Sequence, residues 1–190
     1  MSVKQLIESR RSIRKVKDEQ VEDALVYELL QQAAGLCPHP ERLKSTRFLL
    51  ATEYEARARL TRSLTNIFAS SKLGKWLPDK LWETVNKRFM EIPGHLIVIT
   101  KSDANPQKQD ENIAEACYMM QTLQLLAWER GIGMLWDSED MLYVPQFLEA
   151  LSLAPDEQML GIIHYGYIAK IPRPRKRTEA AKRLTTYPSL

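Results

Sequence analysis

Three arginines and a serine lie within five residues near the start of the chain, as Arg10-Arg11-Ser12-Ile13-Arg14. A phosphate monoester carries nearly two negative charges, and forked guanidinium donors, a hydroxyl and backbone N–H groups together hold it best. The pentad offers three guanidinium groups and one hydroxyl, so a phosphate site is one interpretation. The same residues suit the end of a helix, where each arginine stabilises the helix dipole by about 0.3–1 kcal/mol. Spacing alone favours this second interpretation.

A second basic cluster lies near the other end of the chain, at Pro172-Arg173-Pro174-Arg175-Lys176-Arg177. By itself it fits a solvated tail or a nonspecific contact with a polyanion. It also fits a second set of donors for the same phosphate, because two basic clusters can meet in the fold or across a dimer. The net charge is only +3, which is too small to argue nucleic-acid binding from composition alone.

Two further segments suit the edge of a ligand. Cys37-Pro38-His39-Pro40-Glu41-Arg42 is a proline-fixed loop with polar side chains, although such loops are more often simple helix-to-strand connectors. Trp136-Asp137-Ser138 follows an apolar run, and indole offers a flat face, but a packed tryptophan before an Asx-type turn is the commoner case. No side chain is singled out as an acid or base, and His39 is the nearest candidate.

Motifs of metal binding and nucleotide binding are missing from the sequence. His39, His95 and His164 form no pair with metal-ligand spacing, so no metal site is predicted. Gly131-Ile132-Gly133 lacks the third glycine of a dinucleotide fingerprint and precedes a strand rather than a helix. The sequence contains no P-loop, GxSxG elbow or HExxH motif.

Composition is that of an ordinary globular protein. The chain has 190 residues, 44% hydrophobic and 27% charged, which fits a single domain over residues 1–190. Cys37 and Cys117 have neither CxxC nor metal-ligand spacing, which favours a reducing compartment. The N-terminus has no apolar signal region and no apolar run reaches membrane-spanning length. We therefore expect a cytoplasmic protein with no membrane partner.

Apolar periodicity predicts the elements that position these residues. Helices are expected at 3–10, 21–36, 53–73, 78–90, 109–130 and 145–151. Strands are expected at 48–52, 95–100, 134–136 and 159–168. Helices and strands mix without a strict βαβ rhythm, which favours an α+β layer fold.

Two segments suggest contact with a second subunit. The helix 109–130 is apolar nearly all round, so we expect it to be buried or to lie in a subunit interface. Residues 184–187 are a candidate strand without an adjacent partner in sequence. Adding it to the sheet of a neighbouring subunit is one solution.

Taken in order, four motifs resemble those of the FMN-dependent nitroreductase family, and most closely its short single-domain members. Ser9-Arg10-Arg11-Ser12-Ile13-Arg14 is similar to the family's RRSxR phosphate site. Ala33-Ala34-Gly35-Leu36-Cys37-Pro38, leading to Arg47-Phe48, is similar to its AAxxAPSxxNxQPWRF segment. Glu129-Arg130-Gly131-Ile132-Gly133 resembles AxxxGLGxxW, and the run 160–167 resembles the xxLGYP strand. The resemblance covers nearly the whole chain.

The resemblance implies a nitroreductase-like α+β fold, in which helices flank a central, mostly antiparallel sheet and the C-terminal tail adds to the partner subunit. It implies an obligate homodimer with two FMN sites at the interface. It also implies a ping-pong reaction, in which NAD(P)H gives a hydride to the flavin, which passes it to a nitroaromatic, quinone or similar acceptor. The nicotinamide stacks on the flavin, so no Rossmann fingerprint is needed.

The resemblance also implies a role for each candidate residue. The ribityl phosphate would be held by Arg10, Arg11, Ser12 and Arg14, helped by Arg173 or Arg175. The isoalloxazine of one of the two flavins would be reached by the loop that contains Pro38, His39, Pro40 and Arg42. Near the ring would lie Trp136, Asp137 and Ser138.

The sequence departs from the family at the redox edge, where Arg42 replaces the amide that usually faces the flavin and Thr46 replaces the tryptophan. A cation beside the flavin pyrimidine favours the reduced form, whereas the same arginine could fill the substrate space. A non-redox flavin-binding or flavin-processing protein is therefore the alternative. A nucleic-acid-binding module is a third hypothesis, which the lack of an aromatic-studded basic strand disfavours.

Overall fold

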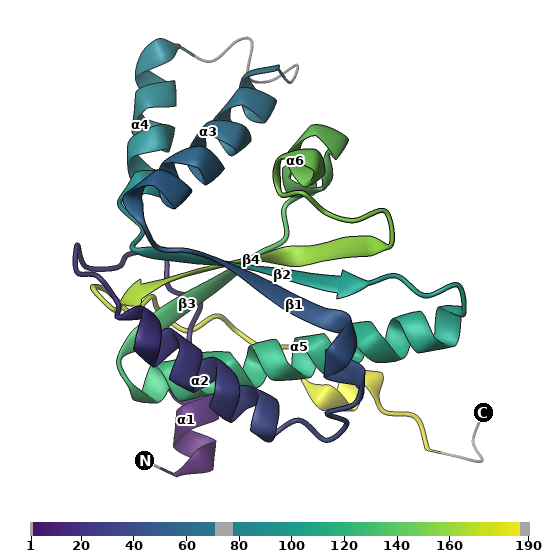
Figure 1. The fold of residues 1–190 in the computed structure, drawn as a ribbon. Helices are drawn as coiled ribbons and strands as arrows, with labels where there is room; N and C mark the ends of the chain where they lie inside the picture. The colour runs from purple at the N-terminus through teal and green to yellow at the C-terminus, as the bar shows by residue number, and fades with distance from the viewer. Residues whose placement is uncertain (1, 71–77, 187–190) are drawn as a thin grey trace.

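The computed structural model describes residues 2–70 and 78–186. A twisted sheet lies between two layers of helices, with α2 and α5 on one side and α3, α4 and α6 on the other (Figure 1). In chain order the elements are α1 (Val3–Ser9), α2 (Asp23–Gly35), η1 (Arg42–Ser45), β1 (Thr46–Ala51), α3 (Tyr54–Ser70), α4 (Asp79–Met90), β2 (Gly94–Lys101), α5 (Pro106–Glu129), β3 (Ile132–Asp137), η3 (Asp140–Tyr143), α6 (Pro145–Ala150), β4 (Glu157–Tyr167) and η4 (Ala180–Arg183). The predicted α+β layer fold and the predicted order of helices and strands are confirmed.

The differences from the predicted boundaries have local causes. Helix α5 begins three residues early, at Pro106, because Asn105 caps it by accepting a hydrogen bond from the Gln107 N–H at 3.0 Å, and proline fits a first turn. The candidate tail strand 184–187 is not a strand in residues 184–186, which follow η4 without pairing to the sheet. Tyr187 lies outside the described residues.

The sheet has the strand order β1-β2-β4-β3, and each neighbouring pair is antiparallel. The register between β2 and β4 shifts once, because Val98 pairs with Gly161 and Ile99 pairs with Met159. Leu160 is thus an extra residue in β4, a β-bulge. Because of this bulge, Met159 and Ile162 both reach the same apolar layer, although strict alternation would place them on opposite faces.

Each face of the sheet carries its own apolar layer. Leu96, Val98 and Ile163 pack with the helices α2 and α5. Ile97 and Ile162 pack against side chains of α3 and α6. Strand β2 is therefore buried on both faces, which explains why its sequence is a nearly continuous apolar run.

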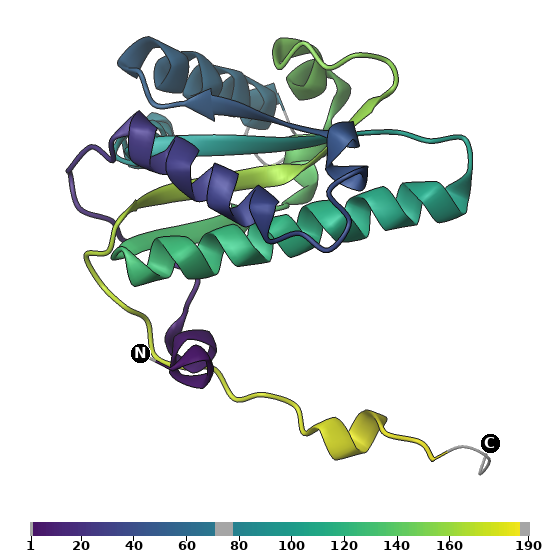
Figure 2. The same cartoon turned by 60° about the horizontal axis from the view of Figure 1, so that its bottom comes forward.

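The segments that follow α1 and β4 meet at one edge of the sheet. The first loop runs beside β3, with Ser12 bridged to Met134, and Val16 is bridged to Ile168 just past β4. Beyond this point residues 171–186 are exposed. Figure 2 shows α1 and this tail projecting from the body of the molecule. Among the described residues, no helix combines the length and apolarity needed to cross a bilayer.

A bidentate ion pair joins the starts of β1 and β4 across β2. Arg47 Nε and Nη2 donate to the two carboxylate oxygens of Glu157 at 2.6 and 2.7 Å. These hydrogen bonds are the main cause that lowers the pKa of Glu157 to about 2, and a further bond from the Ala154 N–H acts in the same direction. The paired carboxylate therefore stabilises the fold above its unfolded pKa, near 4.5, and this contribution is lost as the pH falls from about 4.5 to about 2.

We expect the substitution Glu157→Gln to remove part of the acid sensitivity of the fold. The free energy of unfolding, measured with urea at pH 6 and at pH 3, should differ less between the two pH values in the variant than in the wild type. Glu91→Gln is the matched control, because Glu91 forms an exposed pair with Lys87 at 3.9 Å and such pairs contribute little. Equal acid sensitivity in the wild type and Glu157→Gln would contradict this assignment.

Candidate active site

A cavity of about 620 Å³ lies between the first loop, the end of β3 and the tail. We call it the basic cavity, because among the described residues its lining holds cations and no acidic side chain. The cations are Arg10, Arg11, Arg14, Lys15, Lys170, Arg173, Arg175 and Arg177. Ser12, Leu135, Trp136 and Pro172 complete the lining. The two basic clusters therefore meet within one chain, which is one of the two arrangements that the sequence left open.

The first loop is held in place by one buried residue. Ile13 is 3% exposed, and its N–H donates to the Met134 carbonyl at 3.0 Å. Its side chain lies over Gly133, where a Cβ atom would come within 2.6 Å of it. In an extended segment neighbouring side chains point to opposite sides, so burying Ile13 turns Ser12 and Arg14 outward.

The helix-end interpretation holds for one of the arginines. Arg11 Nη1 donates to the carbonyl of Glu8 at 2.5 Å and to the carbonyl of Arg10 at 2.8 Å, so it stabilises the end of α1. Arg10 instead follows α1 as its extended cap residue and lines the cavity with its side chain. The two interpretations of the pentad are therefore compatible.

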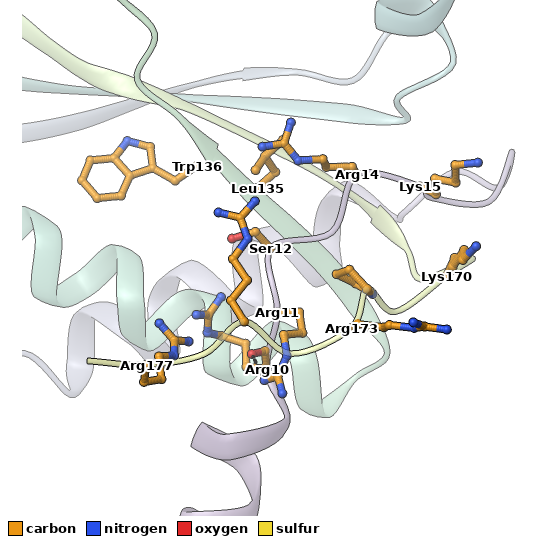
Figure 3. A pocket seen from close by; sticks show the side chains of 12 residues that line it. Arg10, Arg11, Ser12, Arg14, Lys15, Leu135, Trp136, Lys170, Arg173 and Arg177 are labelled. Carbon is orange, nitrogen blue, oxygen red and sulfur yellow. Dashed lines mark hydrogen bonds between the residues drawn. The ribbon is translucent and has the colours of Figure 1, made fainter. Parts of the chain in front are cut away.

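Like charges crowd the basic cavity. Burial is the first cause that lowers the pKa of Arg10, and the positive charges of Arg177 and Arg11 lower it further. Figure 3 shows the guanidinium groups of Arg10 and Arg177 beside each other. Such an arrangement is unfavourable without an anion, and it matches a ligand that carries more than one negative charge.

Trp136 lies at the rim of the basic cavity and is 41% exposed. Its Nε1–H donates to the Leu160 carbonyl at 3.0 Å, and the Tyr143 hydroxyl donates to the same oxygen at 3.2 Å. Gly161 has a φ of +138° and faces the indole, so that a Cβ atom there would lie 2.4 Å from Trp136 Nε1. The β-bulge therefore provides both the acceptor and the space that fix the indole.

A second cavity of about 250 Å³ adjoins the first, because Arg14 and Leu135 line both. We call it the apolar cavity, since most of its wall is apolar: Ile13, Val16, Phe89, Ile92, Leu135 and the aromatic Tyr165. Four charged or ionisable groups interrupt this wall: Arg14, Arg88, Asp137 and His164. Asp137, predicted near a flavin ring, thus lines the apolar cavity, whereas Ser138 lines neither cavity.

Two histidines without metal-ligand spacing in sequence are paired in the fold. His95 of β2 lies opposite His164 of β4, and their Nδ1 atoms are 2.7 Å apart. His164 Nε2 lies 3.4 Å from Asp137 Oδ2, and the Phe89 ring meets the His164 ring edge-on, with centroids 5.7 Å apart. The hydrogen bond from His164 is the first cause that lowers the pKa of Asp137.

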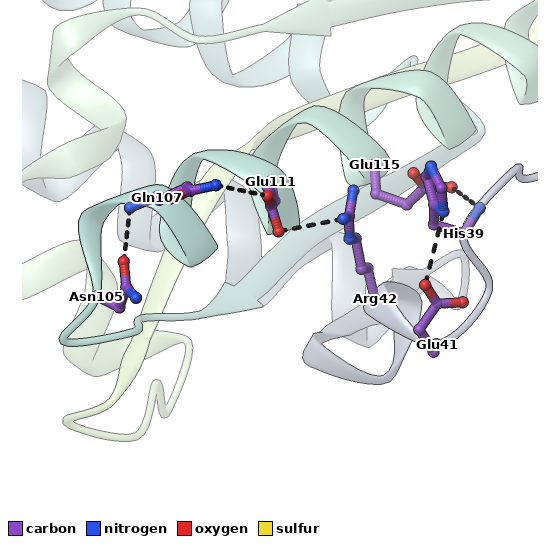
Figure 4. A network of polar contacts seen from close by, with 7 residues as sticks. All are labelled: His39, Glu41, Arg42, Asn105, Gln107, Glu111 and Glu115. Atoms are coloured by element: carbon purple, nitrogen blue, oxygen red, sulfur yellow. Dashed lines mark hydrogen bonds and ion pairs between the residues drawn. The ribbon is translucent and has the colours of Figure 1, made fainter.

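The proline-rich loop is tied to α5 and lies apart from both cavities of its own chain. The His39 N–H donates to Glu115 Oε1 at 3.1 Å, and Arg42 Nη2 pairs with Glu111 Oε2 at 3.2 Å (Figure 4). Neither cavity is lined by Pro38, His39, Pro40 or Arg42. A contact between this loop and the flavin of a partner subunit stays a prediction.

Several lining residues escaped the sequence analysis. Lys170 has no charged neighbour in sequence to mark it, and Arg88 and Phe89 reach the apolar cavity only through the packing of α4. Lys15 directly follows the pentad, so its charge was the available signal, whereas Arg177 belongs to the basic cluster at 172–177 that the sequence analysis had named. Within the described ranges, no three His, Cys, Asp or Glu side chains are grouped to hold a metal ion.

Comparison with known proteins gives one consistent result. The pattern of the nitroreductase family matches residues 7–167. The Bacillus subtilis (strain 168) protein named "Putative NAD(P)H nitroreductase YfhC" is 33% identical over 185 residues, which are 96% of this chain and 93% of that protein. The crystal structure of a nitroreductase-like family protein from Bacillus cereus is 31% identical, with a TM-score of 0.88, over 99% of this chain and 97% of that chain.

A more distant solved structure shares the fold. An FMN-dependent nitroreductase from Clostridium difficile R20291 is 20% identical, with a TM-score of 0.68, over 97% of this chain and 99% of that one. The family pattern covers most of the chain, and two relatives exceed 30% identity over nearly its whole length. The nitroreductase-like fold expected from the four motifs is therefore confirmed, and the chain belongs to the nitroreductase family.

Proposed function

We propose that this protein binds FMN and uses it to pass a hydride from NAD(P)H to a small organic acceptor, such as a nitroaromatic or a quinone, by a ping-pong mechanism. The observation that carries the proposal is the junction of two cavities with different chemistry. The basic cavity suits a dianionic phosphate and the apolar cavity suits a planar ring system. They meet at Arg14 and Leu135, as the phosphate and ring of one mononucleotide require.

The donors of the basic cavity fit the phosphate end of FMN. Arg10, Arg11, Ser12 and Arg14 come from the first loop, and Arg173 and Arg175 come from the tail. Forked guanidinium groups and a hydroxyl hold a phosphate with short, charge-assisted hydrogen bonds. Burial first, and then the positive charges of Arg177 and Arg11, lower the pKa of Arg10. A bound dianion would offset the repulsion among these three guanidinium groups.

The apolar cavity fits the ring end. Its hydrophobic wall would exclude water, and Arg14 and Arg88 place positive charge at its edge. A fixed cation beside the flavin favours the reduced ring, which carries negative charge. Within one chain this role falls to Arg14 and Arg88 instead of Arg42, whose charge is paired with Glu111. When bound, the flavin supplies the hydride transfer itself.

A homodimer is part of the proposal. Large apolar side chains are exposed on α1, on α5 and along the tail: Val3, Ile7, Tyr118, Ile171 and Leu184. Together they suit an interface between two copies of the chain. Association would cover α1 and the tail, and it would bring the proline-rich loop of one subunit toward the site of the other.

The names of two similar proteins support the proposed reaction. The 33% identical relative is named an NAD(P)H nitroreductase, which supports a nicotinamide donor. The C. difficile structure is described as FMN-dependent, which supports the cofactor. At 20% identity, however, it supplies the fold, so the argument for FMN depends on the two cavities.

The proposal predicts a colour change that can be followed by eye. Purified protein saturated with FMN should bleach when NADPH or NADH is added without oxygen, and a quinone or nitroaromatic should restore the yellow colour. Initial rates at several acceptor concentrations should give the parallel lines of a ping-pong reaction. Protein that takes up no FMN would contradict the proposal, and protein that binds FMN but stays yellow with both nucleotides would establish the non-redox alternative.

A further inference from the structure

Three polar side chains form a row across the face of the sheet that α3 and α4 cover. His95, His164 and Asp137 come from the adjacent strands β2, β4 and β3. The His95 ring is fully buried, whereas the side chains of His164 and Asp137 are 6% and 21% exposed and line the apolar cavity. The row of side chains thus leads from the core of the protein to the wall of that cavity.

The 2.7 Å contact between the two Nδ1 atoms sets how many protons the two rings share. One proton lies between them, because two lone pairs or two N–H groups would repel at this distance. Burial first, and then the positive charges of His164 and Arg57, lower the pKa of His95 to about 3, while the Phe89 backbone weakly opposes them. His95 therefore stays neutral, and His164 is the ring of the pair that lines the apolar cavity.

His164 can carry a proton on each ring nitrogen without losing a hydrogen bond. As an imidazolium it donates from Nδ1 to His95 and from Nε2 to Asp137. The observed 3.4 Å between Nε2 and Oδ2 is long for a charge-assisted hydrogen bond, which is about 2.7–2.9 Å, so the pair has room to close when the proton arrives.

Among the described residues that line the apolar cavity, the charged groups other than Asp137 and His164 are positive. Arg14 of the first loop and Arg88 of α4 line the same cavity, and Arg57 of α3 acts on His95. These three cations oppose an imidazolium, whereas the Asp137 carboxylate supports it. Negative charge arising in the apolar cavity would offset the cations and thereby favour protonation of His164.

We propose that His164 takes up one proton when negative charge arises in the apolar cavity, and that it delivers this proton through Asp137 to an oxygen of the acceptor. The inference depends on the proposed function. A quinone that receives a hydride gains two electrons and one hydrogen, and it needs one more proton to become a hydroquinone. The Nε2–H bond of His164 breaks, Asp137 passes a proton on, and an O–H bond forms on the acceptor.

The remaining steps restore the resting state. His164 returns to the neutral form and takes its next proton from solvent that enters after the product has left. Over one turnover NAD(P)H, one proton and a quinone give NAD(P)⁺ and a hydroquinone, so atoms and charge balance. His95 is a positioning residue, because the 2.7 Å contact between the two Nδ1 atoms leaves Nε2 of His164 facing Asp137.

The midpoint potential of the bound flavin tests this inference. In the wild type, two protons accompany two electrons, one on the ring and one on His164. In His164→Gln only the ring proton remains, so the potential should fall with pH about half as steeply as in the wild type. Equal slopes in proteins that both bind FMN and bleach would overturn the inference while leaving the proposed function intact.

A second variant and a second measurement keep the inference testable if His164→Gln fails to fold. Asp137→Asn removes the charge that supports the imidazolium and should also flatten the slope, whereas Asp140→Asn, an exposed neighbour that lines neither cavity, should keep the wild-type slope. In flavin-free protein, nitrogen NMR of the rings should show that His95 stays neutral at every pH at which the protein is folded. Protonation of His95 in the folded protein would also overturn the inference, whether or not the protein binds FMN.

Discussion

Replacing both Arg10 and Arg11 with alanine is expected to remove FMN from the protein and leave the fold intact. Both side chains line the basic cavity. A hydrogen bond to a charged group contributes about 1.5–3 kcal/mol, so losing two should weaken FMN binding roughly 100-fold to 10,000-fold. The measurement is the flavin absorbance that stays with the protein through gel filtration, followed by titration with FMN.

The matched control removes the same charge from the same region. Lys4 and Lys17 flank the pentad, and neither lines the basic cavity, so Lys4→Ala/Lys17→Ala should bind FMN about as well as the wild type. Arg11 also stabilises the end of α1 through the Glu8 carbonyl, so circular dichroism of both variants separates loss of binding from loss of the helix. Full flavin occupancy in the arginine variant would remove the phosphate site from the proposed function.

Adding a single methyl group at Gly161 is expected to destabilise the sheet strongly. The φ of +138° is one that L side chains rarely adopt, and a Cβ atom would lie 2.5 Å from the Asp137 carbonyl oxygen as well as against the Trp136 indole. Backbone strain of this kind costs about 1–3 kcal/mol and overpacking a similar amount. We expect Gly161→Ala to lower the free energy of unfolding by about 2–5 kcal/mol, measured in urea.

Gly35→Ala is the control for this substitution. Gly35 ends α2 with no atom within 4 Å of an added Cβ, so alanine there should be neutral or stabilise the protein by up to about 1 kcal/mol. In Gly161→Ala the displaced indole should also change its fluorescence and weaken FMN binding, because Trp136 borders the basic cavity. Unchanged stability in Gly161→Ala would show that the bulge does not hold the indole.

Local signals explain which parts of the fold and site the sequence predicted. The order of helices and strands follows from apolar periodicity, and four lining residues of the basic cavity come from five adjacent positions, so neither needs long-range information. Asn105 and Pro106 also carry a local start signal for α5, which the broader apolar pattern obscured.

The unpredicted parts depend on the register of the sheet. His95 and His164 lie 69 positions apart in sequence, and they meet because β2 and β4 pair in one register. The sequence around Arg42 does not indicate that its charge will pair with Glu111 of α5. These contacts arise only when the strands have paired and the helices have packed, so composition and spacing leave them undetermined.

The exposed tail gives the two ends of the site different freedom to evolve. Residues 171–186 are exposed in the chain, yet Arg173, Arg175 and Arg177 line the basic cavity. Substitutions there can change the positive charge that lines the basic cavity with little effect on the free energy of unfolding. In the apolar cavity His164 is buried between strands, so a substitution there must also fit the packing of the core.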